Sequence, residues 1–366
     1  MCVYYFFRVK NKLNKNIVVV GELHQDLYYE SDFYWQLVQK IVTNIIDFIK
    51  FNPDDLNRKL FEKIVKKGFS ETPKKIVGHC YFKRGGNGNN SAEFIAKLGV
   101  FTKLISVIGR GSEWMITELN ELSINTDDIF QIDEITPVST IIKSDFTTKI
   151  HLAPNLKNRM NFEGIEIEDD AFLNAKILYS TPIAKKFIKL FENGSKLGLI
   201  TAFNIETQKV QSIEQLDGLI KQKFDLFFLN LKDAYSILNG TFSIDQVDEK
   251  FKKYAKIRIY TAGKGGSFTR TDNFEIFFPG IEVEEVVDRT GAGDCFAAGF
   301  LTKLFELVKD KEMLDQLNKD ENLEKLRDIL SKCIEFATYT AIYKITNQLI
   351  PTKKEMEDFI KTFKIK

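Results

Sequence analysis

The sequence predicts an α/β protein built around a mostly parallel, doubly wound sheet with a small antiparallel β unit attached. Short apolar runs alternate with helical stretches along most of the chain, and this alternation is typical of a parallel sheet with helices on both faces. Residues 17–21 (IVVVG) are β-branched and end in glycine, as a buried parallel strand does before its loop. Residues 136–152 are rich in threonine and isoleucine around a polar break, which predicts an antiparallel hairpin outside the main sheet.

Two helices are expected directly after the first strand and its loop. From residue 33 to 51, apolar side chains recur at three- and four-residue steps, which predicts an amphipathic helix. Residues 52–55 (NPDD) have the composition of a helix cap and first turn, so a second helix is expected to run to about Lys67 and stop at Gly68.

The later elements alternate between strands and helices. Residues 75–83 return to an extended pattern, and the glycine-rich residues 85–90 (GGNGNN) are expected to form a loop before a helix over residues 91–98. Further buried strands are predicted at residues 104–108, 176–180, 197–203, 224–229 and 256–262. After Gly291 the chain is expected to be helical nearly to its end.

The composition excludes several functional classes. The chain has 366 residues, and its 52 basic and 51 acidic side chains leave a net charge of +1, so nucleic acid is not expected as a partner. No apolar run approaches the roughly 20 residues that cross a bilayer, so a membrane is not expected either. The four cysteines are Cys2, Cys80, Cys295 and Cys333. They lack metal-ligand or redox spacing, which favours reduced thiols in a cytoplasmic protein.

Residues 288–300 (DRTGAGDCFAAGF) carry the clearest chemical signal. The small residues Gly291, Ala292 and Gly293 allow backbone amides to approach an anion at the start of a predicted helix, where free amides attract phosphate. Asp294 in that first turn would repel a passively bound phosphate, but it suits a base that takes the proton of an acceptor hydroxyl. From spacing alone, a carboxylate that only stabilises the helix dipole is an equally good interpretation.

The same segment closely resembles the C-terminal signature of the ribokinase family, the PfkB-type carbohydrate kinases. A second block, residues 85–99 (GGNGNNSAEFIAKLG), resembles the N-terminal signature of that family at its expected place. The resemblance runs from about residue 17 to about residue 343 and leaves residues 33–67 uncovered. It implies a ribokinase-like three-layer α/β sandwich and ATP-dependent kinase chemistry.

The resemblance implies roles for individual residues. Asp294 corresponds to the catalytic base, and the anion hole corresponds to Gly291, Ala292 and Gly293. The positions that match the acceptor-binding residues of the family are Asp26, Gly85, Gly86, Asn87 and Asn90. A carboxylate such as Asp26 can accept two hydroxyl hydrogen bonds and so orient a polyol. Members that act on sugar phosphates carry a lysine where Asn87 stands, so an unphosphorylated acceptor is expected.

Two further segments resemble the nucleotide site of the family. In TAGKGG, the matching positions are Thr261, Gly263 and Gly266, although a tight turn leaving a strand would have the same composition. Asn230 and Asp233 resemble an asparagine–glutamate motif linked to Mg²⁺, with aspartate in place of glutamate. The alternative is a helix start that Asn230 caps.

The resemblance also implies a site for a monovalent cation, usually K⁺. Asp288 and Thr290 correspond to positions that help to bind this ion. Residues 344–351 (KITNQLIP) depart from the pattern, because they lack the glycine that commonly follows the lysine.

The expected organisation is one kinase domain over residues 1–366. A small β lid is expected from about residues 22–32, 73–84 and 131–152, with residues 33–67 as a helical insert. The acceptor is expected to bind between the lid and the sheet, and two edge-like hairpin segments in the lid predict a homodimer through it.

The predicted reaction transfers the γ-phosphoryl group of ATP, with Mg²⁺, to a hydroxyl of a small sugar or sugar acid. A nucleoside such as adenosine or cytidine is the alternative acceptor. An interpretation from another class is a sugar or nucleotide sensor that keeps the fold without turnover.

Overall fold

The protein divides into two compact units. The structure is a computed structural model that describes residues 15–51, 58–70, 76–143, 149–152, 160, 162, 165–283, 285–347 and 349–365. The first unit, here the large unit, comprises residues 1–23, 86–135 and 160–366, and the second, here the small unit, comprises residues 24–85 and 136–159. Each unit has its own sheet.

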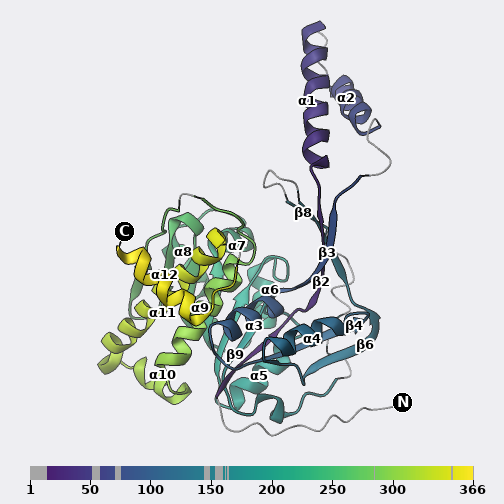
Figure 1. The fold of residues 1–366 in the computed structure, drawn as a ribbon. Helices are drawn as coiled ribbons and strands as arrows, with labels where there is room; N and C mark the ends of the chain where they lie inside the picture. The colour runs from purple at the N-terminus through teal and green to yellow at the C-terminus, as the bar shows by residue number, and fades with distance from the viewer. Residues whose placement is uncertain are drawn as a thin grey trace. The chain divides into compact units, whose positions relative to one another are not determined.

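Within the part of the chain that the structure describes, the large unit is built on a ten-stranded sheet. Its strand order is β14-β13-β12-β11-β10-β9-β1-β4-β5, with β6 also paired to β4. Helices surround this sheet (Figure 1). The pairs from β12 to β5, and the pair of β4 with β6, are parallel, whereas β13 and β14 add an antiparallel edge. The strands are β1 (Asn16–Gly21), β4 (Thr102–Arg110), β5 (Ile124–Asn125), β6 (Ile129–Ile135), β9 (Ala175–Thr181), β10 (Ile200–Ile205), β11 (Phe224–Asn230), β12 (Ala255–Thr261), β13 (Ser267–Arg270) and β14 (Glu275–Phe278).

The central strands are buried on both faces because their apolar residues are continuous. In β1, Ile17 and Val19 belong to one apolar cluster, and Val18 and Val20 belong to the other. Successive side chains of a strand point to opposite faces, so the two clusters are the two sides of the sheet. This arrangement of helix, sheet and helix confirms the predicted three-layer sandwich.

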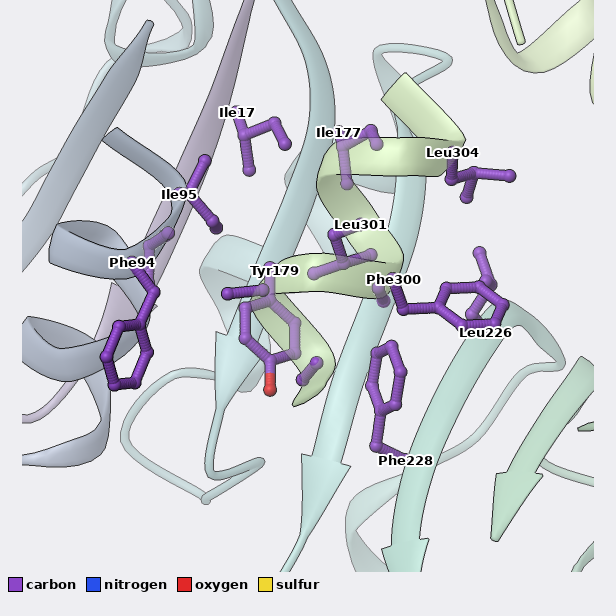
Figure 2. Close-up of a cluster of buried hydrophobic side chains, with 14 of the residues drawn as sticks. Ile17, Phe94, Ile95, Ile177, Tyr179, Leu226, Phe228, Phe300, Leu301 and Leu304 are labelled. Carbon is purple, nitrogen blue, oxygen red and sulfur yellow. The ribbon is translucent and has the colours of Figure 1, made fainter. Parts of the chain in front are cut away.

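The first cluster packs side chains of the sheet against helices that begin in the two glycine-rich segments (Figure 2). Phe94 and Ile95 come from α3, and Phe300 and Leu301 come from α9. The helices that supply this face are α3 (Asn87–Lys97), α4 (Glu113–Glu121), α9 (Ala292–Leu307), α10 (Lys311–Leu317) and α11 (Leu323–Asn347). The last helix, α12 (Lys353–Ile365), contacts α11.

The second cluster contains the helices of the opposite face: α5 (Ile188–Lys196), α6 (Ile213–Leu219), α7 (Leu231–Ile237) and α8 (Ile244–Phe251). Three short 3₁₀ turns are also described: η2 (Asp169–Phe172), η3 (Gly263–Gly265) and η4 (Asp320–Asn322). Among the described residues, no helix combines the length and the apolar character needed to traverse a lipid bilayer.

The small unit is a four-stranded sheet in the order β3-β2-β7-β8 together with a pair of helices. Its elements are β2 (His24–Glu30), α1 (Phe33–Phe51), α2 (Arg58–Ser70), β3 (His79–Gly85), β7 (Val138–Lys143) and β8 (Lys149–Leu152). The antiparallel β7–β8 pair is the hairpin that the sequence predicts. In the helical pair, Gly68 lies against Ile41, since a Cβ at Gly68 would be 2.6 Å from Ile41 Cγ1.

Three boundaries differ from those expected. Residues 131–135, expected in the small β lid, belong instead to β6, which pairs with β4 in the large sheet. Their alternating pattern suits a strand of either sheet, so the sequence does not distinguish the two. The second helix ends at Ser70, just beyond Gly68. The third difference affects the site, because α3 begins at Asn87, so that most of GGNGNN is helix and not loop.

Candidate active site

The start of α9 lies near the carboxyl ends of β10, β11 and β12 and is shaped by Gly291. This residue caps the helix with φ 74°, a left-handed conformation that an L side chain adopts only with strain. The first amides of a helix have no acceptor within the helix itself. Of these, the amide of Ala292 donates to the Arg289 carbonyl at 3.2 Å. Gly291, Ala292 and Gly293 all line one pocket of about 350 Å³. We call it the carboxylate pocket.

Asp294 lies in the first turn of α9 and is only 9% exposed. Its Oδ2 accepts a hydrogen bond of 3.0 Å from Asn90 Nδ2. Burial raises the pKa of Asp294 to about 7, and the hydrogen bond from Asn90 offsets part of that rise. A carboxylate with a pKa near neutrality is suited to take up and release a proton.

Asn90 reaches Asp294 because of the close packing between α3 and β1. A Cβ at Gly88 would lie 2.6 Å from the carbonyl carbon of Gly21, so only a glycine permits this approach. The contact fixes the first turn of α3 against the carboxyl end of β1. Asn87 and Asn90 project on the same side of the helix because they are three residues apart in that turn.

Glu206 is the residue of the carboxylate pocket that the sequence analysis missed. It directly follows β10, and its Oε1 accepts hydrogen bonds from Asn87 Nδ2 and from Asn204 Nδ2, the latter at 2.8 Å. Burial, followed by the charges of Asp294 and Asp233, raises the pKa of Glu206 to about 8. Its position after a strand of a parallel sheet was the available signal, since ligands bind at those carboxyl ends.

Further polar residues of the carboxylate pocket come from the ends of β10 and β11. Asp233 Oδ1 accepts a hydrogen bond of 2.7 Å from Thr207 Oγ1. Asn230 caps α7 by accepting from the Lys232 amide at 2.9 Å, so the alternative interpretation of Asn230 as a helix cap is confirmed. The lining also includes Asn87, Asn204, Glu206, Gln208, Phe228, Leu229, Thr261, Arg289, Asp294 and Phe296.

A second pocket of about 420 Å³ adjoins the first, because both are lined by Asn230, Thr261, Arg289, Ala292, Gly293 and Phe296. We call it the apolar pocket. Its other walls come from the loop after β12, the segment before α9, and α11: Gly263, Lys264, Gly266, Ser267, Gly280, Ile281, Glu282, Val283, Val286, Thr338, Ala341, Ile342 and Ile345. A largely aliphatic pocket that adjoins a helix N-terminus suits a flat base attached to phosphates.

The predicted acceptor-binding residues fall in both units. In the small unit, the Asp26 carboxylate lies directly over Gly85, where a Cβ would be 2.4 Å from Asp26 Oδ2. His24 Nε2 is 3.3 Å from Asp26 Oδ1. In the large unit, Gly86 precedes α3 as its cap residue, while Asn87 and Asn90 hold carboxylates.

The predicted cation residues outside the pockets form a local turn. Asp288 Oδ1 accepts hydrogen bonds from the Thr290 amide at 2.9 Å and from Thr290 Oγ1 at 2.7 Å. The amides of Val287 and Asp288 both donate to the Ile345 carbonyl. Within the described ranges, no group of three or more histidine, cysteine, aspartate or glutamate side chains is arranged to hold a metal ion.

Comparison with known proteins identifies the family. The model of the pfkB family carbohydrate kinases matches residues 54–349, which is most of the chain. The chain belongs to the pfkB family of carbohydrate kinases. The family predicted from the two glycine-rich blocks is thereby confirmed.

Individual relatives are distant. The chain is 29% identical to the cytidine kinase of Thermococcus kodakarensis over 44% of its length, and this match spans only 58% of that relative. It is 26% identical to the 5-dehydro-2-deoxygluconokinase of Geobacillus thermodenitrificans, over 59% of this chain and 71% of the relative. Among solved structures, the ribokinase of Arabidopsis thaliana complexed with ribose and ATP matches with a TM-score of 0.66 at 18% identity, covering 95% of this chain and 99% of the ribokinase. That likeness confirms the ribokinase-like fold.

Proposed function

We propose that this pfkB-family kinase transfers the γ-phosphoryl group of ATP to a hydroxyl of a small-molecule acceptor, with Asp294 as the general base. The observation that carries the proposal is the position of Asp294. It is a buried carboxylate with a pKa near 7, in the first turn of a helix whose opening residues line the same pocket. A base and an anion-stabilising site then serve one reaction.

The residues divide the work as follows. The adenine of ATP occupies the apolar pocket, and its phosphates extend toward Gly291, Ala292 and Gly293, whose amides stabilise charge on the phosphoryl group. Asp294 takes the proton of the acceptor hydroxyl as the oxygen attacks the γ-phosphorus. The bond from that phosphorus to the bridging oxygen breaks, and ADP leaves. Thr261, Gly263 and Gly266 shape the loop beside the nucleotide.

Cations complete the proposal. A carboxylate and an ATP tail together suit Mg²⁺, which commonly binds one or two carboxylates plus substrate phosphates. Asp233 faces the carboxylate pocket and is the residue that would hold the ion, which neutralises phosphate charge when it is bound. Asp288 and Thr290 remain the proposed contacts for K⁺.

The proposed acceptor is an unphosphorylated sugar or sugar acid. Asp26, Gly85 and Gly86 are the proposed acceptor contacts, together with Asn87 and Asn90. The small unit is proposed as a lid that closes over the acceptor and as the surface of a homodimer. A cytoplasmic location is proposed with it. The likeness to a cytidine kinase favours a second candidate, a nucleoside acceptor of the same family.

The test combines a base variant with a substrate panel. We expect Asp294→Asn to lower kcat by at least about 10²-fold, since general-base catalysis contributes on that order, while ATP binding measured by calorimetry stays within a few-fold. Asp328→Asn, a surface change on α11, is the control and is expected to match the wild type. ADP release with a panel of sugars, sugar acids and nucleosides identifies the acceptor. Full turnover by Asp294→Asn would show that Asp294 is not the general base. An absence of ADP release with every acceptor would favour the alternative of a sensor without turnover.

A further inference from the structure

We propose that Asn90 is a positioning residue that fixes how the base is presented: its amide occupies Oδ2 of Asp294 and leaves Oδ1 as the oxygen that receives the proton of the acceptor. This inference rests on the proposed role of Asp294 as the base. It assigns Asn90 an action through Asp294, beyond the acceptor contact expected from the sequence.

Hydrogen bonds hold both the backbone and the side-chain amide of Asn90. Its backbone amide donates to the Gly86 carbonyl at 2.9 Å, which anchors the residue in the first turn of α3. Its side-chain oxygen accepts from Asn89 Nδ2 at 3.3 Å, and its side-chain nitrogen donates to Asp294 Oδ2 at 3.0 Å. An ionised carboxylate only accepts hydrogen bonds, so the Asn90 side chain must turn its NH₂ group, and not its oxygen, toward Asp294.

This geometry limits the chemistry of Asp294. A carboxylate has two oxygens, and the bond from Asn90 prevents free rotation that would exchange them. When the hydroxyl of the acceptor attacks phosphorus, its O–H bond breaks and the proton moves to Oδ1, while the new O–P bond replaces the bond to ADP. Fixing the receiving oxygen in advance removes an orientational cost from the transition state.

The electrostatic surroundings of Asp294 make this hydrogen bond important. The charged or ionisable residues of the same pocket are Glu206, Asp233 and Arg289, and Tyr179 lies close enough for the Asp294 charge to raise its pKa. Burial raises the pKa of Asp294, and the Asn90 hydrogen bond opposes it by stabilising the ionised form. Without Asn90, a larger fraction of Asp294 is protonated near neutral pH and cannot act as a base.

Asn87 provides a matched control within the same helical turn. It is the same residue type, three positions earlier, but its amide donates to Glu206 and not to Asp294. A loss that follows from general disturbance of α3 would affect variants at both positions. Asn87 is itself a proposed acceptor contact, so Asn87→Leu is expected to lower kcat/KM. A shift of the acidic limb that follows from the base would appear only at Asn90.

The experiment compares Asn90→Leu and Asn90→Ala with Asn87→Leu in the full-length protein. Leucine keeps the approximate shape of asparagine without a donor, and alanine removes the same donor without adding a charge if leucine prevents folding, which thermal unfolding checks. For both Asn90 variants we expect the acidic limb of the pH profile of kcat/KM to move up by about one pH unit or more, as expected for a lost charge-assisted hydrogen bond. At Asn87 we expect an unmoved acidic limb.

The outcomes separate this inference from the proposed function. If Asp294→Asn abolishes turnover but the acidic limb is unmoved in both Asn90 variants and only the KM of the acceptor rises, Asn90 is an acceptor contact and the positioning role is wrong. If Asp294→Asn is active, the base itself is wrong. A moved limb in the Asn90 variants together with an inactive Asp294→Asn supports both.

Discussion

At the scale of single residues, the site contains groups that disfavour folding. Glu206 is partly buried among other carboxylates, and its folded pKa of about 8 lies far above the ordinary value of 4.5. The charge of Lys209 lowers the pKa of Glu206 but offsets only part of this rise. Lys186 and Lys209 both pair with Glu22, whose pKa is lowered to about 2 even though burial alone would raise it. Carboxylates retained under such conditions are typical of functional sites.

A stability measurement tests how much the charge of Glu206 destabilises the folded protein. Because its folded pKa is raised, the ionised form is disfavoured in the folded state, so stability falls as pH rises from the unfolded pKa toward about 8. Glu206→Gln keeps an acceptor for Asn87 and Asn204 and removes the charge. We therefore expect it to unfold with a free energy higher than wild type by on the order of 2 kcal/mol at pH 9, after allowance for partial solvent screening.

Urea unfolding at pH 5 and pH 9 checks this prediction. The gain should shrink at pH 5, where Glu206 is protonated in the folded protein. Glu121→Gln, an exposed change at the end of α4, should show no such pH dependence. An equal gain at both pH values would mean that the charge of Glu206 is not the cause.

The sequence was sufficient to place together those residues of the candidate site that lie in one contiguous motif. The position of Gly291 to Asp294 at a helix start could be predicted because the cap and the carboxylate belong to one turn. Glu206 and the partners of the two asparagines could not be predicted in that way. Their contacts join α3 to the ends of β10 and α9, more than a hundred positions away, and a pattern of neighbours along the chain does not contain such pairs.

At the scale of elements, the approach of α3 to β1 decides where the asparagines point. The start of α3 was missed from the sequence because glycine and asparagine are poor helix formers, so GGNGNN has the composition of a loop. Packing overrides that preference. Gly21 and Gly88 meet backbone to backbone, and the helix begins as soon as it contacts the strand.

Adding one methyl group at this contact tests its importance. A Cβ at Gly88 would lie 2.6 Å from the Gly21 carbonyl carbon and 2.8 Å from the Glu22 amide, so Gly88→Ala must move α3 away from β1. We expect a loss of about 1–3 kcal/mol in the free energy of unfolding, typical of overpacking, and a fall in kcat because Asn90 moves with the helix.

The control is Gly218→Ala in α6, where no atom lies within 4 Å of the added Cβ. There the better helix propensity of alanine should be neutral or stabilising by up to about 1 kcal/mol. Opposite signs for the two substitutions, measured by chemical denaturation, would confirm that close packing and not propensity governs Gly88. A stabilised Gly88→Ala protein with normal kcat would contradict it.

At the scale of the whole molecule, a buried ion network stabilises the large sheet. It lies at the amino ends of β10, β11 and β12, whereas the candidate site lies at their carboxyl ends. Asp225 on β11 is 1% exposed, and its Oδ2 accepts hydrogen bonds of 3.0 Å from both the amide and the hydroxyl of Thr201 on β10. Lys256 on β12 and Lys311 on α10 complete the network. One carboxylate thus joins three adjacent strands and a helix.

Removing that charge should destabilise the large unit in a pH-dependent way. Burial alone would raise the pKa of Asp225, but Lys311, the Thr201 amide and Lys256 more than offset it, and the pKa is lowered below its usual 3.8. A depressed pKa contributes stability above the unfolded value that is lost as pH falls through the folded value. Asp225→Asn should therefore cost about 3–5 kcal/mol near pH 7, because two lysines lose a buried partner.

Denaturant unfolding from pH 7 down to about pH 3 distinguishes this mechanism from a simple packing defect. The difference between Asp225→Asn and the wild type should narrow as the pH falls below about 4, where the wild-type carboxylate starts to lose its advantage. Asp328→Asn, which removes an exposed pair with Lys332 on one helix, should change stability by no more than about 0.5 kcal/mol. A difference for Asp225→Asn that stays constant down to the acid transition would show that shape and hydrogen bonding, and not charge, hold β10, β11 and β12 to α10.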